Sequence, residues 1–361
     1  MTLFGDKTVE YYNKDRIAAK PAEERITLGI ESSCDETAAA ILRGGRELLA
    51  DVISTQVPIH RKYGGVVPEI ASRNHILNVL PVVDEALKQA DMKLSDIDQI
   101  AVTYGPGLVG ALLVGVAAAK SLAYALEIPL IGVNHLEGHI FANFLSAPDL
   151  KPPFVALVAS GGHTALVHVA DYDSFRLLGQ TRDDAAGEAF DKVARVMGLP
   201  YPGGPEIDRL AKEGDPHAID FPKALAKGGY EFSFSGLKSA VLNYLNSQKL
   251  KNIPVNNADV AASFQQTVIA ILVDKSLSAL RETGLDTLVL AGGVAANSAL
   301  EAELRQATGA AGYKFFFPSR RMCTDNAAMI ACRGYYQSLS RDYEYTPLTL
   351  NAVPGLSLSD R

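Results

Sequence analysis

The sequence has no tryptophan and only three cysteines, Cys34, Cys323 and Cys332. Three cysteines without a C-x-x-C pair cannot form a disulfide framework, so they favour a reducing compartment. The charged first 25 residues contain no apolar segment of the kind that a signal peptide needs. The longest apolar run, residues 107–119, ends at Lys120 and is shorter than the roughly 20 residues of a membrane span. We therefore expect a cytoplasmic protein that does not enter a membrane.

Basic charge is also in short supply, because 34 Lys and Arg face 41 Asp and Glu and leave a net charge of −7. This balance excludes a protein that coats nucleic acid by bulk charge, although a local basic patch or a basic partner remains compatible with it. Hydrophobic residues make up 48% of the chain, which excludes disorder over its whole length. A chain of 361 residues is long enough for two domains or one two-lobed unit.

One order of elements occurs twice along the chain. Residues 26–42 and 153–169 both have the pattern of a strand, a polar turn and a second strand. Residues 97–124 and 284–307 both have the pattern of a strand, a glycine loop and a helix. The repetition predicts a duplicated α/β fold with mixed sheets and two lobes around a central cleft.

The same sequence patterns predict how the chain divides into domains. We expect a polar N-terminal extension (1–25), an N-terminal lobe (26–150), a C-terminal lobe (151–325) with a helical insertion at about 187–263, and a C-terminal helix and tail (326–361), the helix returning to the N-terminal lobe.

Two histidines form the strongest local motif, in LIGVNHLEGHIFANFL (130–145). Asn134 can cap a helix with Glu137 at its third position, which places His135 and His139 one turn apart on one face. They follow a short strand, at the kind of edge where open α/β sheets bind ligands. Two such imidazoles can share a metal ion, or they can be capped, partly buried histidines without a ligand. In zinc proteases of the H-E-x-x-H type the glutamate stands one position earlier, so Glu137 points roughly 100° away from that place.

Asp325 is the candidate for a third metal ligand. It follows the strand-like residues 315–317 and Pro318, and Thr324 can cap a helix that begins at Asp325. The alternative is a carboxylate that only stabilises a helix start, by about 0.3–1 kcal/mol. A site of two histidines and one aspartate would leave coordination positions open and would suit Zn or Fe(II).

Glycine-rich turns form a second group of candidates. Four of them, at 105–110, 160–164, 201–208 and 291–297, stand at the ends of strand-like or loop segments. Glycine there permits close approach of the backbone to a phosphate, and a following helix adds a favourable dipole. Each turn alone is weak evidence for a ligand site, but four such turns in a duplicated fold favour a nucleotide-binding site. Neither a P-loop nor a G-x-G-x-x-G motif in a strand–helix context is present.

The turn ESSCDET (31–37) gathers Glu31, Asp35 and Glu36. These carboxylates could bind the water ligands of Mg²⁺ or accept a proton from a substrate, and the alternative is a solvated acidic turn. Carboxylates beside Cys34 are expected to raise the pKa of its thiol, so we do not expect this cysteine to be a nucleophile.

Long motifs resemble the tRNA adenosine threonylcarbamoyltransferase family over about residues 26–340. They are IESSCDETAAAI, GGVVPEIASRNHI, YGPGLVGALLVGVAAAKSLA, GVNHLEGHI, LVASGGHTALV, DDAAGEAFDKVARVMGLPYPGGPEID, FSFSGLKSAV, AGGVAANSALE and CTDNAAMIA. The resemblance implies an actin-like (ribonuclease H-like) ATPase fold that is shared with sugar kinases, in agreement with the duplicated plan. The first 25 residues are outside the usual pattern.

The resemblance also implies a set of site residues. It implies that one divalent metal ion, Fe or Zn, is held by His135, His139 and Asp325, and it makes Asp35 and Glu36 candidates for catalysis or for ordering the site. The residues that it places around a nucleotide-like substrate are Val158, Ala159, Ser160, Gly161, Gly162, Asp191, Gly204, Asp208 and Asn297. The displaced Glu137 argues against the protease activity once ascribed to such proteins.

The activity that the resemblance implies is transfer of a threonylcarbamoyl group from threonylcarbamoyl-AMP to the N6 amine of the adenosine 3′ of the anticodon in tRNA. The glycine turns would hold the AMP part, the metal would orient and polarise the threonylcarbamoyl part, and Asp35 or Glu36 could accept the proton. The implied partners are tRNA, a non-catalytic paralogue of the same fold, a small P-loop ATPase and a separate synthase that supplies the adenylate, with Mg and ATP as a further cofactor pair.

Two alternatives to this activity remain open. One is an actin-like ATPase or sugar kinase, which would not need His135 and His139. The other is a non-catalytic scaffold that binds a nucleotide and a partner. The basic pairs Arg61–Lys62 and Arg320–Arg321 are short, as solvated surface pairs are, so they identify no tRNA site.

Overall fold

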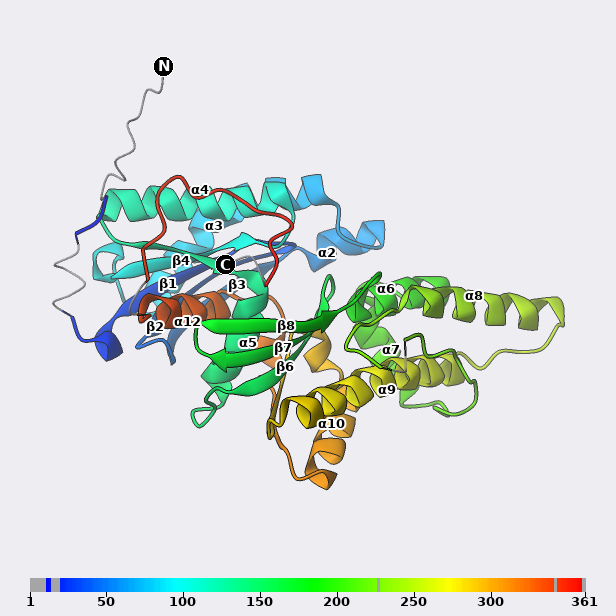
Figure 1. Cartoon of the computed structure of the whole chain (residues 1–361). Helices are drawn as coiled ribbons and strands as arrows, with labels where there is room; N and C mark the ends of the chain where they lie inside the picture. The colour runs from blue at the N-terminus through cyan, green and yellow to red at the C-terminus, as the bar shows by residue number, and fades with distance from the viewer. Residues whose placement is uncertain (1–10, 14–19, 226–227, 341–342, 359–361) are drawn as a thin grey trace, which may run out of the picture. The chain divides into compact units, whose positions relative to one another are not determined.

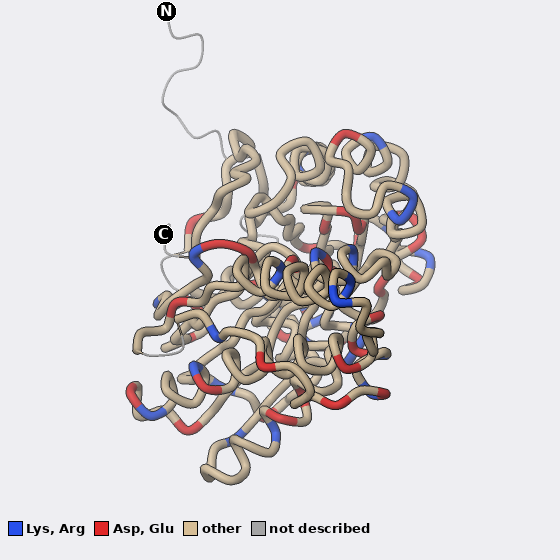
Figure 2. The backbone as a smooth tube through the Cα atoms, turned by 90° about the vertical axis from the view of Figure 1, so that its right-hand side faces the viewer, with Lys and Arg blue, Asp and Glu red and all other residues tan. Residues whose placement is uncertain are grey.

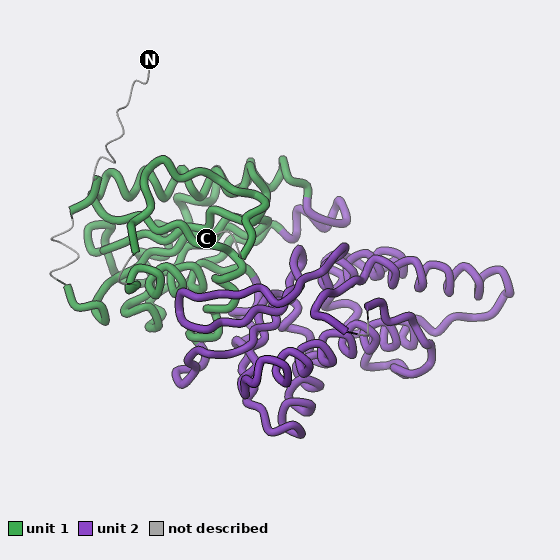
Figure 3. Tube along the Cα trace, viewed as in Figure 1, with its two compact units in different colours: residues 1–56, 67–145, 325–360 green, residues 57–66, 146–324, 361 purple. Residues whose placement is uncertain are grey.

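The computed structural model describes residues 11–13, 20–225, 228–340 and 343–358, and most of the expected N-terminal extension lies outside these ranges. The chain divides into two compact units, which Figure 3 colours separately. Unit 1 comprises residues 1–56, 67–145 and 325–360, and unit 2 comprises residues 57–66, 146–324 and 361. Each unit contains a five-stranded sheet.

The sheet of unit 1 has the strand order β3-β2-β1-β4-β5. Its first three strands are antiparallel neighbours, whereas β4 pairs parallel with both β1 and β5. Every residue of β1, β4 and β5 except Tyr104 is buried, as expected for strands that helices cover on both faces. The strands are β1 (Ile26–Glu31), β2 (Glu36–Arg43), β3 (Glu47–Thr55), β4 (Gln99–Gly105) and β5 (Leu130–Asn134).

Helices cover both faces of this sheet, with α3 and α4 on one face and α12 on the other (Figure 1). Small residues let α12 approach the sheet closely, because a Cβ atom on Gly29 of β1 would lie 2.2 Å from the carbonyl oxygen of Ala327. The helices of this unit are α3 (Pro68–Gln89), α4 (Val109–Leu126), α5 (His135–Ser146) and α12 (Ala327–Ser338), with short 3₁₀ turns at Ala22–Glu24 and Leu94–Asp96.

Unit 2 repeats the topology with a larger set of helices. Its sheet has the order β8-β7-β6-β9-β10, with β6, β7 and β8 antiparallel and β9 parallel to both β6 and β10. The strands are β6 (Phe154–Ala159), β7 (Thr164–Asp171), β8 (Ser174–Gln180), β9 (Thr287–Ala291) and β10 (Lys314–Phe316). The helices are α2 (Val57–His60), α6 (Ala186–Val196), α7 (Gly203–Ala211), α8 (Ser235–Leu250), α9 (Asn257–Thr283), α10 (Ser298–Ala310) and α11 (Arg320–Cys323), with 3₁₀ turns at Arg61–Tyr63 and Gly293–Ala296.

The expected duplication is confirmed. In both units, two antiparallel strands follow the first strand of the sheet on one side, and two parallel strands extend it on the other. The two strand–turn–strand segments and the two strand–loop–helix segments stand at equivalent places in the two sheets. The class predicted from the sequence, a duplicated α/β fold with mixed sheets, is therefore the observed one.

One local expectation was wrong. The helix expected to begin at Asp325 begins at Ala327, and Asn326 rather than Thr324 is its N-cap, because the Asn326 side chain accepts a hydrogen bond from Met329 N–H at 2.9 Å. The helix expected within residues 97–124 is α4, which continues past Lys120 to Leu126 and is 18 residues long. By length and composition alone α4 could cross a membrane, but a single helix of this kind is weak evidence, since core helices of soluble proteins meet the same criterion.

The C-terminal segment 343–358 lies along β4 and β5 without forming a helix or strand of its own. Thr346 N–H donates to the Leu130 carbonyl, Val353 N–H donates to the Tyr104 carbonyl, and Asn134 Nδ2 donates to the Ser357 carbonyl. Tyr11 fastens this segment, since its hydroxyl donates to the Thr346 carbonyl at 2.9 Å and accepts from Leu130 N–H at 2.9 Å. Burial raises the pKa of Tyr11 to about 12, so the hydroxyl remains protonated and can donate.

Replacing Tyr11 by Phe should therefore lower the free energy of unfolding by about 1–3 kcal/mol, because Leu130 N–H loses its partner. Urea unfolding at neutral pH measures the change. Tyr124→Phe on α4 is the matched control, since its side chain is 67% exposed and its loss of a hydroxyl should cost less than about 0.5 kcal/mol. Equal stability of the two variants would contradict the bridging role.

Candidate metal centre and nucleotide pocket

The junction of β5 and α5 places both histidines. Asn134 ends β5, and its side chain accepts a hydrogen bond from Leu136 N–H at 2.9 Å, so the expected cap is present. Helix α5 begins at His135, and the rings of His135 and His139 stand edge to face with centroids 4.6 Å apart. Both side chains are buried. The i, i+4 spacing thus brings two imidazoles together at the end of β5, an edge strand of the sheet.

Asp325 completes a group of three possible metal ligands. Its Oδ1 lies 3.4 Å from His135 Nε2 and 3.1 Å from His139 Nε2, and one ligand atom from each residue falls within 4.8 Å of the others. Zinc binds nitrogen and oxygen at about 2.0–2.2 Å, so neighbouring ligands of a tetrahedral ion stand roughly 3.3 Å apart. The separations therefore match a shared ion.

The surroundings of His139 also fit a metal ion. Both of its ring nitrogens are buried, and neither makes a hydrogen bond of acceptable geometry within the described part of the chain, although Nε2 lies 3.1 Å from Asp325 Oδ1. A buried polar atom without a hydrogen bond needs an explanation, and a bound cation on Nε2 is one. The donor set of two imidazoles and one carboxylate suits Zn or Fe.

The charges in this group support one another. Burial raises the pKa of Asp325, but the neighbouring His135 and His139 outweigh burial and bring this pKa well below its usual range. Burial lowers the pKa of His135, but Glu31 and Asp325 outweigh it and raise this pKa well above its usual value. When the site holds no metal, the charges of Asp325 and His135 thus stabilise each other.

Glu137, on the same helix, is not among the three possible metal ligands. Its carboxylate is buried and pairs with Arg333 Nε of α12 at 2.5 Å. The geometry agrees with the expectation that Glu137 is not placed as the base of a zinc protease.

The acidic turn between β1 and β2 belongs to the same unit. Glu36 is the first residue of β2 and accepts a hydrogen bond from the Thr55 hydroxyl at 2.8 Å. Burial raises the pKa of Glu36 to about 8, and the charges of Asp35 and Asp325 add to this effect. Burial, with the negative charge of Asp35, also raises the pKa of the Cys34 thiol, as the sequence predicted. The turn and the three metal-ligand candidates therefore influence one another electrostatically.

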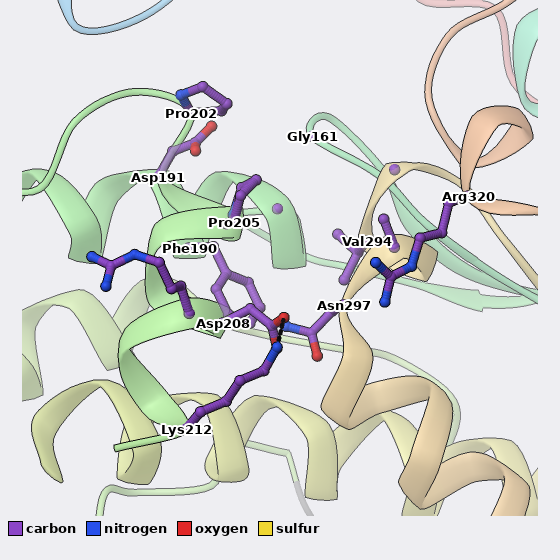
Figure 4. Close-up of a pocket in the computed structure, with 15 residues that line it drawn as sticks. Gly161, Phe190, Asp191, Pro202, Pro205, Asp208, Lys212, Val294, Asn297 and Arg320 are labelled. Atoms are coloured by element: carbon purple, nitrogen blue, oxygen red, sulfur yellow. Dashed lines mark ion pairs between the residues drawn. The ribbon is translucent and has the colours of Figure 1, made fainter. Parts of the chain in front are cut away.

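A cavity of about 440 Å³ lies in unit 2 (Figure 4). Three of the four predicted glycine turns contribute to its walls, while the turn at 105–110 lies in unit 1. The lining residues are Gly161, Gly187, Phe190, Asp191, Pro202, Gly204, Pro205, Asp208, Arg209, Lys212, Gly293, Val294, Ala296, Asn297 and Arg320. A Cβ atom added at Gly161, Gly204 or Gly293 would meet no other atom within 4 Å, so these turns leave open space.

Five of the nine residues proposed to surround a nucleotide line this cavity, namely Gly161, Asp191, Gly204, Asp208 and Asn297. Asp191 accepts a hydrogen bond from Gly203 N–H at the start of α7, and Asp208 accepts one from the Ser298 hydroxyl. Asn297 caps α10 and donates to Gln265 Oε1 at 2.7 Å. These polar side chains therefore join α6, α7, α9 and α10 around the cavity.

The other four residues do not line the cavity. Val158 and Ala159 are fully buried within β6, Ser160 closes the β6–β7 turn through Ser160 N–H and the His163 carbonyl at 2.8 Å, and Gly162 belongs to the same turn. Three cationic lining residues, Arg209, Lys212 and Arg320, were missed from the sequence. The pair Arg320–Arg321 was interpreted as solvated surface residues. Only the position of Arg320 after a strand-like segment could have indicated that it lines the cavity.

Comparison with solved structures defines the class first. A full-length HypF in a phosphate- and nucleotide-bound form matches 87% of this chain and 46% of its own with a TM-score of 0.59 and 14% identity. Component A of (R)-2-hydroxyglutaryl-CoA dehydratase from Acidaminococcus fermentans matches 88% of this chain and 100% of its own with a TM-score of 0.52 and 16% identity. At such low identity these likenesses establish the fold alone, and the protein has the duplicated actin-like ATPase fold.

Sequence comparison then gives the family. The model of the tRNA N6-adenosine threonylcarbamoyltransferase family matches residues 47–332. The protein of that name from Moorella thermoacetica is 61% identical over 339 residues, which cover 94% of this chain and 98% of the relative. The one from Clostridioides difficile is 56% identical over 335 residues, which cover 92% and 98%. The chain belongs to the tRNA N6-adenosine threonylcarbamoyltransferase family.

The raised pKa of Glu36 predicts a pH effect on stability. Its folded-state pKa of about 8 exceeds the ordinary value of 4.5, so between these values the folded state binds more protons than the unfolded state. The stabilisation that Glu36 contributes is therefore fully present below about pH 4.5 and is lost as the pH rises to 8. When the pH is raised from 5 to 8.5, the free energy of unfolding of Glu36→Gln should increase relative to that of wild type by on the order of 2 kcal/mol.

Urea unfolding of both proteins at these two pH values measures this difference. Glu47→Gln on the exposed edge strand β3 serves as the control and should follow wild type. Parallel pH curves for wild type and Glu36→Gln would show that Glu36 is not held in its protonated form.

Proposed function

We propose that this protein transfers the threonylcarbamoyl group of threonylcarbamoyl-AMP to the N6 amine of the adenosine 3′ of the anticodon in tRNA. The single observation that carries the proposal is the convergence of His135, His139 and Asp325 in a member of this family. We also propose that the reaction takes place in the cytoplasm, where its tRNA substrate is available. The N6 amine attacks the carbamoyl carbonyl, the bond from that carbonyl to the phosphate oxygen breaks, AMP leaves, and the amine loses a proton.

In this proposal the cavity of unit 2 binds the nucleotide part of the adenylate. At its open glycine turns a phosphate can come close to the backbone. Arg209, Lys212 and Arg320 supply positive charge at the cavity walls. Lys212 already pairs with Asp208 at 3.5 Å, as the dashed line in Figure 4 shows. Any ATP that enters the same cavity would bring Mg²⁺ with its phosphates.

His135, His139 and Asp325 would hold one Fe or Zn ion. When bound there, the ion supplies Lewis acidity that polarises the carbonyl of the threonylcarbamoyl group. Asp35 is the residue that we assign as proton acceptor, because burial keeps Glu36 protonated at pH 7 and leaves it a hydrogen-bond donor.

The test reconstitutes the reaction from the full chain, its partner proteins, threonylcarbamoyl-AMP and unmodified tRNA, and detects modified adenosine by mass. The variant with both His135→Ala and His139→Ala should lose tightly bound metal and reduce transfer to background, because two of three ligands are gone. His217→Ala is the matched control, since this histidine is exposed and outside both sites, and it should keep both properties.

Each alternative predicts a different result. Full transfer by the double variant would contradict the metal role. Phosphorylation of a small substrate without transfer would favour the sugar kinase alternative, and AMP binding without any transfer would favour a scaffold.

The proposal includes protein partners, because charge alone does not explain tRNA binding. Basic and acidic residues are interspersed along the described chain (Figure 2), without the long basic run of a protein that binds nucleic acid unaided. The partners that we propose are a non-catalytic paralogue of the same fold and a small P-loop ATPase, with a separate synthase that supplies the adenylate.

An apolar surface on α3 and α4 suits the paralogue. These two helices pack against each other, and six of their apolar side chains are at least 44% exposed: Ile76, Leu77, Leu80, Val109, Leu113 and Tyr124. Large exposed apolar side chains on neighbouring helices can indicate a protein interface. A paralogue with the same fold would carry a corresponding pair of helices with which to cover it.

Changing Leu77 and Leu80 together to Asp should weaken binding of the paralogue at least tenfold, because two charges would be buried without partners. Isothermal titration of the paralogue into the full chain measures this loss. Leu250→Asp at the end of α8, where the side chain is 84% exposed, is the matched control and should bind as wild type does. Unchanged affinity of the double variant would remove this surface from the proposal.

A further inference from the structure

A buried carboxylate stands behind the metal-ligand candidates and has no role in the proposed reaction. Glu31 is the last residue of β1, and its side chain is fully buried. One carboxylate oxygen accepts a hydrogen bond from Ser33 N–H at 2.5 Å, and the other accepts one from the Thr103 hydroxyl at 2.6 Å. The second oxygen also lies 3.0 Å from His135 Nδ1.

Glu31 contacts the opposite side of the imidazole from Asp325. The Asp325 carboxylate faces His135 Nε2, whereas the Glu31 carboxylate faces Nδ1. The Ser33 hydroxyl lies 3.2 Å from the same Nδ1 and is the weaker competitor, because a hydroxyl can accept or donate while a carboxylate only accepts. In the neutral, metal-binding form of His135, the carboxylate therefore favours a proton on Nδ1 and a lone pair on Nε2.

We propose that Glu31 is a positioning residue that holds His135 in the tautomer and ring orientation required for binding a divalent metal through Nε2. A carboxylate that orients a ligating histidine in this way raises the basicity of the ligand and restricts its rotation. Glu31 acts on the metal only through His135. This inference depends on the proposed metal site, although not on the identity of the transferred group.

The asymmetry of the two histidines supports this role. His139 has no carboxylate on Nδ1, since that atom makes no hydrogen bond within the described residues. The orientation of the pair is thus set at His135, which Glu31 connects to the end of β1. Burying a carboxylate costs several kcal/mol unless it is well paired, and the donors from Ser33, Thr103 and His135 offset that cost.

The first experiment measures binding of Zn²⁺ and Co²⁺ to the full chain by competition with a chelating dye. In Glu31→Gln the amide cannot satisfy Ser33 N–H and His135 Nδ1–H at once, so we expect 10- to 100-fold weaker binding and an altered Co²⁺ absorption spectrum. Asp98→Asn is the matched control. It changes a second buried carboxylate, which accepts a hydrogen bond from Ile26 N–H at the other end of β1, and it should leave metal affinity unchanged.

A double-mutant cycle separates positioning from general destabilisation. In the His139→Ala background, Glu31→Gln should still weaken metal binding at least tenfold, because His135 remains a ligand. In the His135→Ala background, the same change should weaken the residual binding less than twofold. Equal losses in both backgrounds would overturn the proposal, because a purely structural effect does not depend on which histidine is present.

A measurement on the unaltered protein remains decisive if Glu31→Gln fails to fold. Nitrogen-15 NMR of the zinc-loaded full chain should show His135 with a proton on Nδ1 and metal on Nε2. A metal-bound Nδ1, or unchanged zinc affinity in a folded Glu31→Gln variant, would overturn the assignment. Failure of the transfer reaction with metal binding intact would affect only the proposed function.

Discussion

The buried ion pair between Glu137 and Arg333 is the contact on which the metal-ligand candidates depend. Glu137 lies on α5 between the two histidines, and Arg333 lies on α12, the helix that follows Asp325. Both side chains are almost completely buried, and the guanidinium also lies 5.0 Å from the centre of the Phe141 ring. Removing one partner of such a pair typically costs about 3–5 kcal/mol, because the other charge stays buried. The pair therefore fixes the two helices that bring a distant carboxylate to the histidines.

Close packing of small residues supplies the second constraint. Helix α12 lies directly on the sheet because β1 and α12 both carry glycine where a side chain would collide: a Cβ on Gly334 would lie 2.5 Å from Cβ of Ala101. A larger residue at Gly29 or Gly334 would push α12 outward and carry Asp325 away from His135. The spacing of 3.1–3.4 Å within the ligand group is thus a consequence of backbone packing as well as of charge.

Sequence patterns predicted what is local, and missed what depends on contacts between distant residues. The strand–turn–strand segments, the Asn134 cap and the histidine spacing are visible in short windows, and the structure has them. The start of α12 was wrong because Thr324 and Asn326 are both good N-caps, and only the packed structure selects between them. The Glu137–Arg333 pair and the contact between Glu31 and His135 each join residues that are far apart in the sequence. Val158 and Ala159 were placed at the nucleotide by resemblance, but their strand position buries them.

The duplicated topology explains why the two units carry different sites. In each unit a glycine lies close to the carbonyl of a residue at or just after the end of the first strand. In unit 1, Gly107 of the loop after β4 approaches the Ser33 carbonyl, and in unit 2, Gly292 of the loop after β9 approaches the Ala159 carbonyl. In unit 1, Val353 and Leu356 of the C-terminal segment crowd Gly105, and the buried carboxylate of Glu31 stands at the start of the turn. In unit 2, a Cβ atom added at Gly161 or Gly293 would meet no other atom within 4 Å. The same backbone plan therefore gives a group of three possible metal ligands in one unit and an open cavity in the other.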